Sequence, residues 1–174
     1  MTVLKAIVAV CDDWGIGRAG GMVVSNRADM RHFVRCTLGH AVVMGRRTLE
    51  SFPGSRPLRD RRNIVLSRDA SFAPEGVEVA RSLEDLDRLL AGEREAWVIG
   101  GGRVYAELLP RCSEAVVTLN HVIRPADTFF PNLDEDPAWE LMVESEPAVI
   151  EAGEGDAGIS YSFATYRNRG IARG

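Results

Sequence analysis

The stretch Trp97-Val98-Ile99-Gly100-Gly101-Gly102-Arg103-Val104-Tyr105 decides the fold, because an apolar run ends there in three consecutive glycines. Such a run is typical of a buried strand, and the residues after the glycines read as the start of a helix. Glycine lets another group approach the backbone, and the free N–H groups of a helix start suit a phosphate. The turn therefore indicates a nucleotide or another anionic ligand, or else a tight connection without a ligand. It is not the fingerprint G-x-G-x-x-G, because Val104 and Tyr105 follow where that pattern needs a glycine.

The overall composition is that of an ordinary globular domain. The chain has 174 residues, 45% of them hydrophobic, and a formal net charge of -4. This length suits one domain, and the mild negative charge gives no general attraction to nucleic acid or to an anionic membrane. Three cysteines without paired spacing argue against a disulfide framework and a structural zinc site, so no metal is expected. We expect a soluble, cytoplasmic protein, because the sequence has no signal-peptide pattern and no apolar run of the ~20 residues that span a membrane.

Outward from the glycine turn, apolar runs alternate with amphipathic stretches along the chain. Buried strands are expected over residues 5–10, 41–44, 63–67, 76–80, 97–99 and 114–122. Helices are expected to begin near Ser25 or Asn26, Gly45, Ser82 and Gly102. Two alternating, aromatic runs over 139–146 and 159–168 predict an antiparallel hairpin. The order predicts a single α/β domain over residues 1–168, with a mostly parallel sheet, helices on both faces and a frayed tail over 169–174.

Three glycine-containing connections follow strands in this prediction. They are the long loop 11–24, the junction Gly45-Arg46-Arg47 and the turn Gly100-Gly101-Gly102. Ligands of parallel sheets bind beyond the carboxyl ends of the strands, so the three connections should converge on one edge. Two arginines at a helix start are unfavourable unless an anion joins them, and long ordered loops often act as lids. The sequence therefore predicts one nucleotide-sized site at this edge.

Asp29 is an acidic residue for which the pattern allows two roles. If Asn26 caps the helix, Asp29 lies in its first turn, where a carboxylate meets the helix dipole favourably by ~0.3–1 kcal/mol. Asp29 also precedes Phe33 by four residues and so borders the apolar stripe of the helix. A carboxylate there could face a pocket instead of water. Spacing alone leaves both interpretations open, a helix-stabilising charge and a ligand-binding acid.

A series of short motifs covers nearly the whole chain in a characteristic order. It runs through Ile16-Gly17 and Met22, Ala28-Asp29 with Phe33, Met44-Gly45-Arg46 with Thr48 and Glu50-Ser51, Arg56-Pro57-Leu58, Arg61 with Asn63-Ile64-Val65-Leu66-Ser67, the stretch from Ile99 to Tyr105, Thr118, and Asp127-Thr128-Phe129-Phe130-Pro131. Together these motifs resemble dihydrofolate reductase. The resemblance implies an eight-stranded sheet with about four main helices, and the NADPH-dependent reduction of dihydrofolate to tetrahydrofolate. That reaction supports one-carbon metabolism and thymidylate synthesis.

The resemblance assigns the chemistry to Asp29, with Met22 and Thr118 beside it. In the family, the acid on the first helix binds the 2-amino group and the adjacent ring nitrogen of the pterin, and here Thr118 would support it through water. A buried carboxylate favours protonation of the pterin at N5 while hydride passes to C6. Arg61 resembles the clamp for the glutamate carboxylate of the substrate. The other residues implied to contact the substrate are Ile7 and Ile99 through their backbone, and Val8, Met30, Phe33, Phe52, Leu58 and Tyr105.

For the cofactor, the resemblance implies two groups of residues. Ala9, Ile16, Gly17 and Met22 would flank the nicotinamide, and Arg46, Arg47, Thr48, Ser67, Arg68 and Arg81 would surround the adenine-side phosphates. Arg46 and Arg68 would select NADPH over NADH, because a 2′-phosphate invites a guanidinium. The other implied cofactor contacts are Gly45, Leu66, Ile99, Gly100, Gly101, Gly102, Arg103, Val104, Tyr105 and Thr128. The family also implies a cis peptide bond between Gly100 and Gly101.

The chain departs from the family pattern in the loop. After the loop methionine the family usually has Pro-Trp, whereas this chain has Val23-Val24, and Arg27 stands where a second proline is common. The tryptophan that bridges by water to the substrate is therefore missing. Two alternatives stay open: a reductase of the riboflavin-biosynthesis type on the same fold, which would need neither Asp29 nor Arg61, and a catalytically weak protein that binds folate or NADPH. We expect a monomer whose partners are dihydrofolate and antifolate inhibitors.

Overall fold

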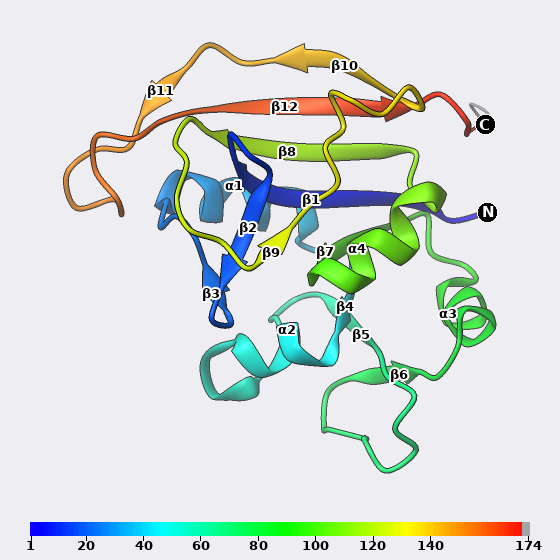
Figure 1. Ribbon diagram of the computed structural model, residues 1–174. Coiled ribbons are helices and arrows are strands. Elements are labelled where there is room, and N and C mark those ends of the chain that lie inside the picture. The colour runs from blue at the N-terminus through cyan, green and yellow to red at the C-terminus, as the bar shows by residue number, and fades with distance from the viewer. Residues whose placement is uncertain (172–174) are drawn as a thin grey trace.

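The protein is built around one large mixed β-sheet (Figure 1). The structure, a computed structural model, describes residues 1–171. The strands lie in the order β10-β12-β8-β1-β7-β4-β5-β6, and β11 pairs with β12 outside this path. Their bounds are β1 Val3–Cys11, β4 Ala41–Gly45, β5 Arg62–Leu66, β6 Glu78–Ala80, β7 Glu95–Gly100, β8 Glu114–Asn120, β10 Trp139–Glu144, β11 Ala148–Val149 and β12 Ser160–Asn168. The predicted α/β sheet is confirmed, and β11 adds two residues to the eight strands of the path.

The register of the sheet brings the carboxyl ends of its central strands together. β1 pairs in parallel with β7 and β8, and β4 pairs in parallel with β5 and β7. The predicted C-terminal hairpin is present, because β12 pairs antiparallel with β10 and with β8. Ala6 of β1 lies opposite Val98 and Ala115, and all three side chains are fully buried. Apolar cover on both faces stabilises such a central parallel strand.

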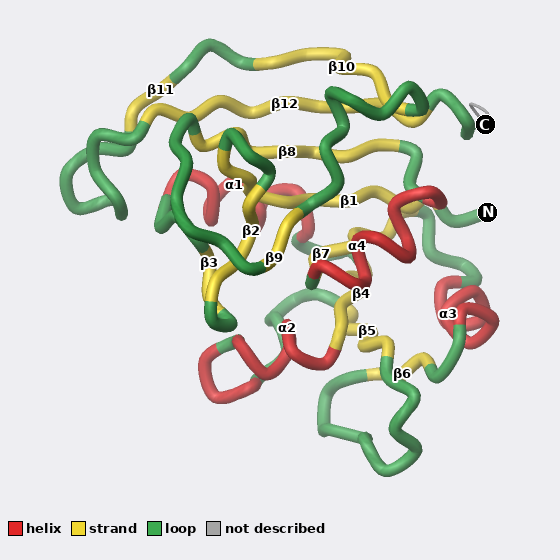
Figure 2. The backbone as a smooth tube through the Cα atoms, viewed as in Figure 1, coloured by secondary structure: helices red, strands yellow, loops and turns green. Residues whose placement is uncertain are grey.

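Four helices cover the two faces of the sheet, as predicted. They are α1 (Arg27–Thr37), α2 (Arg46–Ser51), α3 (Leu83–Leu90) and α4 (Gly102–Leu108). Phe33 and Cys36 of α1 pack in the apolar cluster that contains Ile7 of β1. α3 and α4 pack in the cluster that contains Val8, whose side chain points to the opposite face of the strand. Figure 2 shows the red helices on either side of the yellow strands.

Side-chain caps fix the starts of two helices. The Asn26 side chain accepts hydrogen bonds from the backbone N–H groups of Ala28 and Asp29, at 3.1 and 3.4 Å. The Ser82 hydroxyl accepts one from the N–H of Asp85 at 3.1 Å. These caps satisfy donors that the first turn of a helix leaves free. Of the two caps considered for α1, Asn26 is the one observed.

The segment 11–24 is more regular than the expected loop. It contains β2 (Gly15–Arg18) and β3 (Gly21–Met22), which form a three-stranded sheet with β9 (Thr128–Phe129). Gly15 packs tightly, because a Cβ added to it would lie 2.9 Å from the Cβ of Ala126. Trp14 is buried and stacks on Phe130, with ring centroids 6.1 Å apart. Pairing with the distant strand β9 therefore satisfies backbone groups that a free loop would leave to water.

The C-terminal end of the chain follows β12. Of the frayed tail expected over 169–174, residues 172–174 lie outside the described residues. The N–H of Arg169 donates to the carbonyl of Ala138 at 2.8 Å, and that of Gly170 donates to the Asn168 side chain at 2.9 Å. Within residues 1–171, no helix combines the length and the apolar character needed to cross a bilayer.

Leu108 of α4 offers a test of this packing because its side chain is fully buried against the sheet. We expect Leu108→Ala to lower the free energy of unfolding by about 2–5 kcal/mol, since it removes buried carbons and leaves a cavity. Urea denaturation followed by circular dichroism measures the change. Leu38→Ala, at an exposed leucine next to α1, is the control and should cost less than about 1 kcal/mol. Equal losses in both variants would contradict the packing of α4.

Candidate active site

The candidate site lies at the edge of the sheet where β1, β4 and β7 end. Ala9 of β1 and Ile99 of β7 are half-buried although their neighbours along each strand are buried. Gly45, at the end of β4, lies against the start of α4, because a Cβ added to it would be 3.1 Å from Cγ2 of Val104. The junctions that follow β4 and β7 therefore meet, as the sequence predicts.

The triple glycine is closely packed by threonines from two other segments. The peptide bond between Gly100 and Gly101 is cis, which confirms the prediction, and Gly100 has a φ of 128°, in the region that favours glycine. A Cβ added to Gly101 would lie 3.4 Å from Oγ1 of Thr48, and one added to Gly102 would lie 2.7 Å from Cγ2 of Thr128. Both threonines are implied cofactor contacts, and the fold brings them to the turn.

Asp29 faces the sheet and not the solvent. Its residue is 7% exposed, and its carboxylate accepts a hydrogen bond of 2.6 Å from the Thr118 hydroxyl of β8. Burial raises the pKa of the Asp29 carboxyl, and the hydrogen bond from Thr118 opposes that rise. The resemblance implies that Thr118 supports Asp29 through a water. The observed hydrogen bond is direct and corrects that prediction. Asp29 lies in the first turn of α1, as the helix-stabilising interpretation expects, and its burial against the sheet is what a ligand-binding acid requires.

Tyr105 connects α4 to the central strand beside this acid. Its hydroxyl donates a hydrogen bond of 2.6 Å to the backbone carbonyl of Ile7, and its ring packs edge-on against Phe130. Burial, with the nearby Asp29 carboxylate, raises the pKa of Tyr105, so the phenol stays protonated. The Ile7 carbonyl, implied to meet the pterin, is thereby fixed in direction.

The apolar residues of the predicted substrate pocket divide into two groups. Phe33, Phe52 and Leu58 are half-buried and pack against the cluster around Ile7 on the α1 face. The side chain of Val8, another predicted substrate contact, packs in the cluster on the opposite face. Only the backbone of Val8 can contact a ligand on the α1 side, since neighbouring residues of a strand point to opposite faces.

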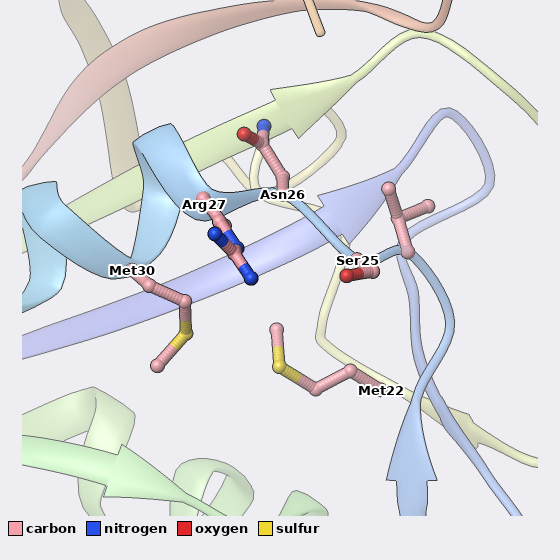
Figure 3. A pocket seen from close by; sticks show the side chains of 6 residues that line it. Met22, Ser25, Asn26, Arg27 and Met30 are labelled. Carbon is pink, nitrogen blue, oxygen red and sulfur yellow. The ribbon is translucent and has the colours of Figure 1, made fainter. Parts of the chain in front are cut away.

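Two exposed methionines flank the entrance between the loop and α1. Met22 is 58% exposed and Met30 is 47% exposed, and they line a cavity of about 190 Å³ together with Val24, Ser25, Asn26 and Arg27. In Figure 3 the Arg27 side chain points toward the space between the two methionines. Arg27 has no ion pair within residues 1–171, which fits its open position. The sequence indicated Arg27 only as a departure from the family pattern. A cation at the start of a helix is unfavourable, and this position could have indicated a residue that meets a ligand.

Arg61 has the surroundings expected of a carboxylate clamp. Its guanidinium donates to the Thr37 hydroxyl at 3.2 Å and to the Arg59 carbonyl at 2.9 Å, and it lies 5.9 Å from the ring centroid of Phe33. It makes no ion pair with any described carboxylate, and burial lowers its pKa. A half-buried cation that lacks a counter-ion gains most from an anionic ligand.

The arginines implied to hold the cofactor phosphates are not equally available. Arg46 already pairs with Glu50 at 2.7 Å and with Asp69 at 3.1 Å. Arg81 donates to the carbonyls of Asp69 and Phe72 and so closes the turn after β5. Arg47, Arg68 and Arg103, by contrast, are exposed and form no ion pair with any described residue. Free guanidiniums of this kind suit the phosphate groups of a dinucleotide.

Val24 is an apolar residue at the position where the family pattern has tryptophan. It is buried and packs with Cys11, Ile150 and Tyr161. The loop therefore keeps a side chain inserted next to α1, but that side chain carries no hydrogen-bonding group.

Comparison with known proteins gives consistent matches. The family model described as dihydrofolate reductase matches residues 3–168. A dihydrofolate reductase of Mycobacterium leprae is 45% identical over 137 residues, which cover 78% of this chain and 79% of the relative. One from Neisseria meningitidis is 35% identical over 166 residues, which cover 95% of this chain and 98% of the relative. The solved structure of dihydrofolate reductase from Enterococcus faecalis, complexed with NADP(H) and RAB-propyl, is similar with a TM-score of 0.85 and 30% identity, covering 95% of this chain and 96% of that one.

The fold and these matches first define a class, the α/β oxidoreductases that use NADPH. The chain belongs to the dihydrofolate reductase family. The expected fold, enzyme class and cofactor are thereby confirmed, and the alternative of a riboflavin-type reductase is set aside.

The hydrogen bond between Thr118 and Asp29 leads to a titration experiment. We expect Thr118→Val to raise the pKa of the Asp29 carboxyl further, because the substitution removes a donor that stabilises the charged form. Carbon-13 NMR titration of that carboxyl measures the shift. Thr165→Val in the neighbouring strand β12 is the control and should leave it unchanged. An unshifted Asp29 titration in Thr118→Val would show that the hydroxyl does not support the carboxylate.

Proposed function

We propose that this chain reduces dihydrofolate to tetrahydrofolate by hydride transfer to C6 coupled to protonation of N5, and so supports one-carbon metabolism and thymidylate synthesis. The observation that carries this proposal is the buried Asp29 carboxylate, which has the Thr118 hydroxyl as its partner and no ion pair with a described basic residue. NADPH, when bound, supplies the hydride. We assign the whole function to one domain over residues 1–168.

In this proposal Asp29 orients the pterin ring. An ionised carboxylate accepts two hydrogen bonds side by side, which suits the 2-amino group and the adjacent ring nitrogen. Its negative charge stabilises the positive charge that develops as N5 takes a proton. Because burial raises its pKa, Asp29 loses its charge at a higher pH than an exposed aspartate does. Its grip on the substrate therefore weakens as the solution becomes acidic.

The remaining substrate contacts follow from the polarity of the pocket. The carbonyls of Ile7 and Ile99 meet the polar edge of the pterin, and Tyr105 keeps the first of them in place. Met30, Phe33, Phe52 and Leu58 enclose the apolar part of the substrate and exclude water from the reacting atoms. Arg61 binds the glutamate carboxylate through its unpaired guanidinium.

On the cofactor side, we assign the phosphates to Arg47, Arg68 and Arg103 with Thr48, Ser67 and the triple glycine. Arg68 is the residue for the 2′-phosphate, because it is exposed and free of protein carboxylates, whereas Arg46 must exchange Glu50 and Asp69 for the ligand. Ala9, Ile16, Gly17 and Met22 flank the nicotinamide. Antifolate inhibitors with a cationic ring would share the Asp29 site with the substrate.

The role of Asp29 can be tested with purified protein and dihydrofolate-dependent oxidation of NADPH. We expect Asp29→Asn to lower the rate about 100-fold near neutral pH and less in acid, where the substrate is already protonated. Asp87→Asn, at an exposed aspartate paired with Arg111, should behave as the unmodified enzyme. No dihydrofolate-dependent rate in the unmodified enzyme at any pH from mildly acidic to neutral would overturn the proposed function. A parallel pH profile for Asp29→Asn would overturn the role of this residue.

Cofactor selection gives a second test. We expect Arg68→Gln to raise the KM for NADPH about tenfold and to change the KM for NADH little, because one charged hydrogen bond to the 2′-phosphate is lost. Arg46→Gln should have the smaller effect, since that guanidinium is held by two protein carboxylates. Steady-state kinetics with both cofactors distinguishes the variants, and an equal loss for NADPH and NADH would refute the assignment.

A further inference from the structure

The end of the loop that carries Met22 is held by a turn far along the chain. The turn is Glu154-Gly155-Asp156, which precedes β12. The N–H of Asp156 donates to the carbonyl of Ser25 at 2.8 Å, and the N–H of Arg27 donates to the carbonyl of Glu154 at 2.9 Å. Gly155 permits this approach, because a Cβ there would lie 2.1 Å from the Ser25 carbonyl oxygen. The contact is therefore specific to a turn without a side chain at its centre.

Arg124, in the connection between β8 and β9, completes this contact. Its Nη1 donates to the Asp156 carboxylate at 2.7 Å and to the backbone carbonyl of Val23 at 3.3 Å. The same carboxylate oxygen accepts a hydrogen bond of 2.9 Å from the N–H of Ser25. One guanidinium nitrogen and one carboxylate oxygen thus connect three chain segments next to Met22.

The other half of the loop is held by the same connection. The Asp127 carboxylate accepts a hydrogen bond from the N–H of Ala19 at 2.8 Å, and the N–H of Asp127 donates to the carbonyl of Gly17 at 2.9 Å. Asp127 therefore contacts the loop before and within the turn between β2 and β3, and Arg124 contacts it after β3. Met22 lies between the two points of attachment.

The sequence of the loop explains why a cation is needed at the Val23 carbonyl, the second point of attachment. Val23 and Val24 have no polar side chain, so this part of the loop offers hydrogen bonds only through its backbone. Val24 is buried, which fixes the loop in depth, but burial is non-directional and does not orient the peptide group before it. The hydrogen bond from Arg124 to the Val23 carbonyl supplies that orientation.

We propose that Arg124 is a positioning residue for the reaction, which holds the Val23 carbonyl and thereby keeps Met22 over the junction of substrate and cofactor. The inference rests on the proposed function. Arg124 contacts Val23 and Asp156, and not Asp29 or Arg61, so its loss leaves these two side chains in place. The consequence is a loop that visits more positions, with fewer of them competent for hydride transfer.

The experiment compares Arg124→Ala and Arg124→Lys with the unmodified enzyme. We expect Arg124→Ala to lower kcat about tenfold while the KM for dihydrofolate changes less than threefold, and Arg124→Lys to recover part of the loss by pairing with Asp156. Arg111→Ala is the matched control, because Arg111 has a side chain of similar exposure and pairs with Asp87 away from the loop. It should leave kcat unchanged.

Hydrogen exchange of residues 21–25 provides the readout that does not depend on turnover. We expect faster exchange in Arg124→Ala at these amides, with an unchanged thermal midpoint of unfolding. Unchanged exchange or an unchanged kcat in Arg124→Ala, with an active unmodified enzyme, would overturn the inference. So would an equal fall of kcat in Arg111→Ala. If the unmodified enzyme is inactive but exchange is faster in Arg124→Ala, the proposed function is overturned, whereas the restraint of the loop by Arg124 is confirmed.

Discussion

The burial of the Asp29 carboxylate against Thr118 is the constraint on which the arrangement of the site depends. A carboxylate removed from water needs a hydrogen-bond donor, and the donor comes from β8, the neighbour of β1. The first turn of α1 must therefore lie close to the sheet. Asn26 holds it there, because its side chain caps α1 and also donates to Asn120 of the same strand at 3.4 Å. Thr118 and Asn120 share one face of β8, so a single strand sets both the start of the helix and the environment of the acid.

Features that depend on neighbouring residues could be predicted from the sequence, and features that depend on distant partners could not. The apolar run of β1, the cap at Asn26 and the glycine turn follow from local spacing, and the structure confirms them. The burial of Asp29 depends on a hydroxyl 89 residues away, so its helix alone allowed two interpretations. Arg46 has one partner of each kind: its pair with Glu50 follows from local i,i+4 spacing, whereas its pair with Asp69, 23 residues further on, does not.

The distribution of charge around the site differs from that of the whole chain. The protein has a formal net charge of -4, yet Arg27, Arg47, Arg61 and Arg68 lack ion pairs with described carboxylates at or near the site edge. Some of the other arginines are paired with carboxylates, as Arg62 is with Glu78 and Glu93. Local excess of one sign over a mildly acidic background is what selects anionic ligands without attracting nucleic acid. Under the proposed function, these unpaired side chains, and not the overall charge, would attract the anionic cofactor and substrate.

The contacts that hold the Met22 loop join segments that are synthesised far apart in time. Ser25 is held by Asp156, which follows it by 131 residues. While the ribosome makes the chain, α1 and the first strands emerge long before their partner, and contacts of such separation form late because the chain between them must first be ordered. A nascent chain that ends before Asp156 already contains Asp127 and Arg124, which contact the loop, but it lacks the contact at Ser25 and the core residues Ala164 and Tyr166 of β12. The full set of contacts on the loop therefore forms only near the end of synthesis, together with the last part of the apolar core.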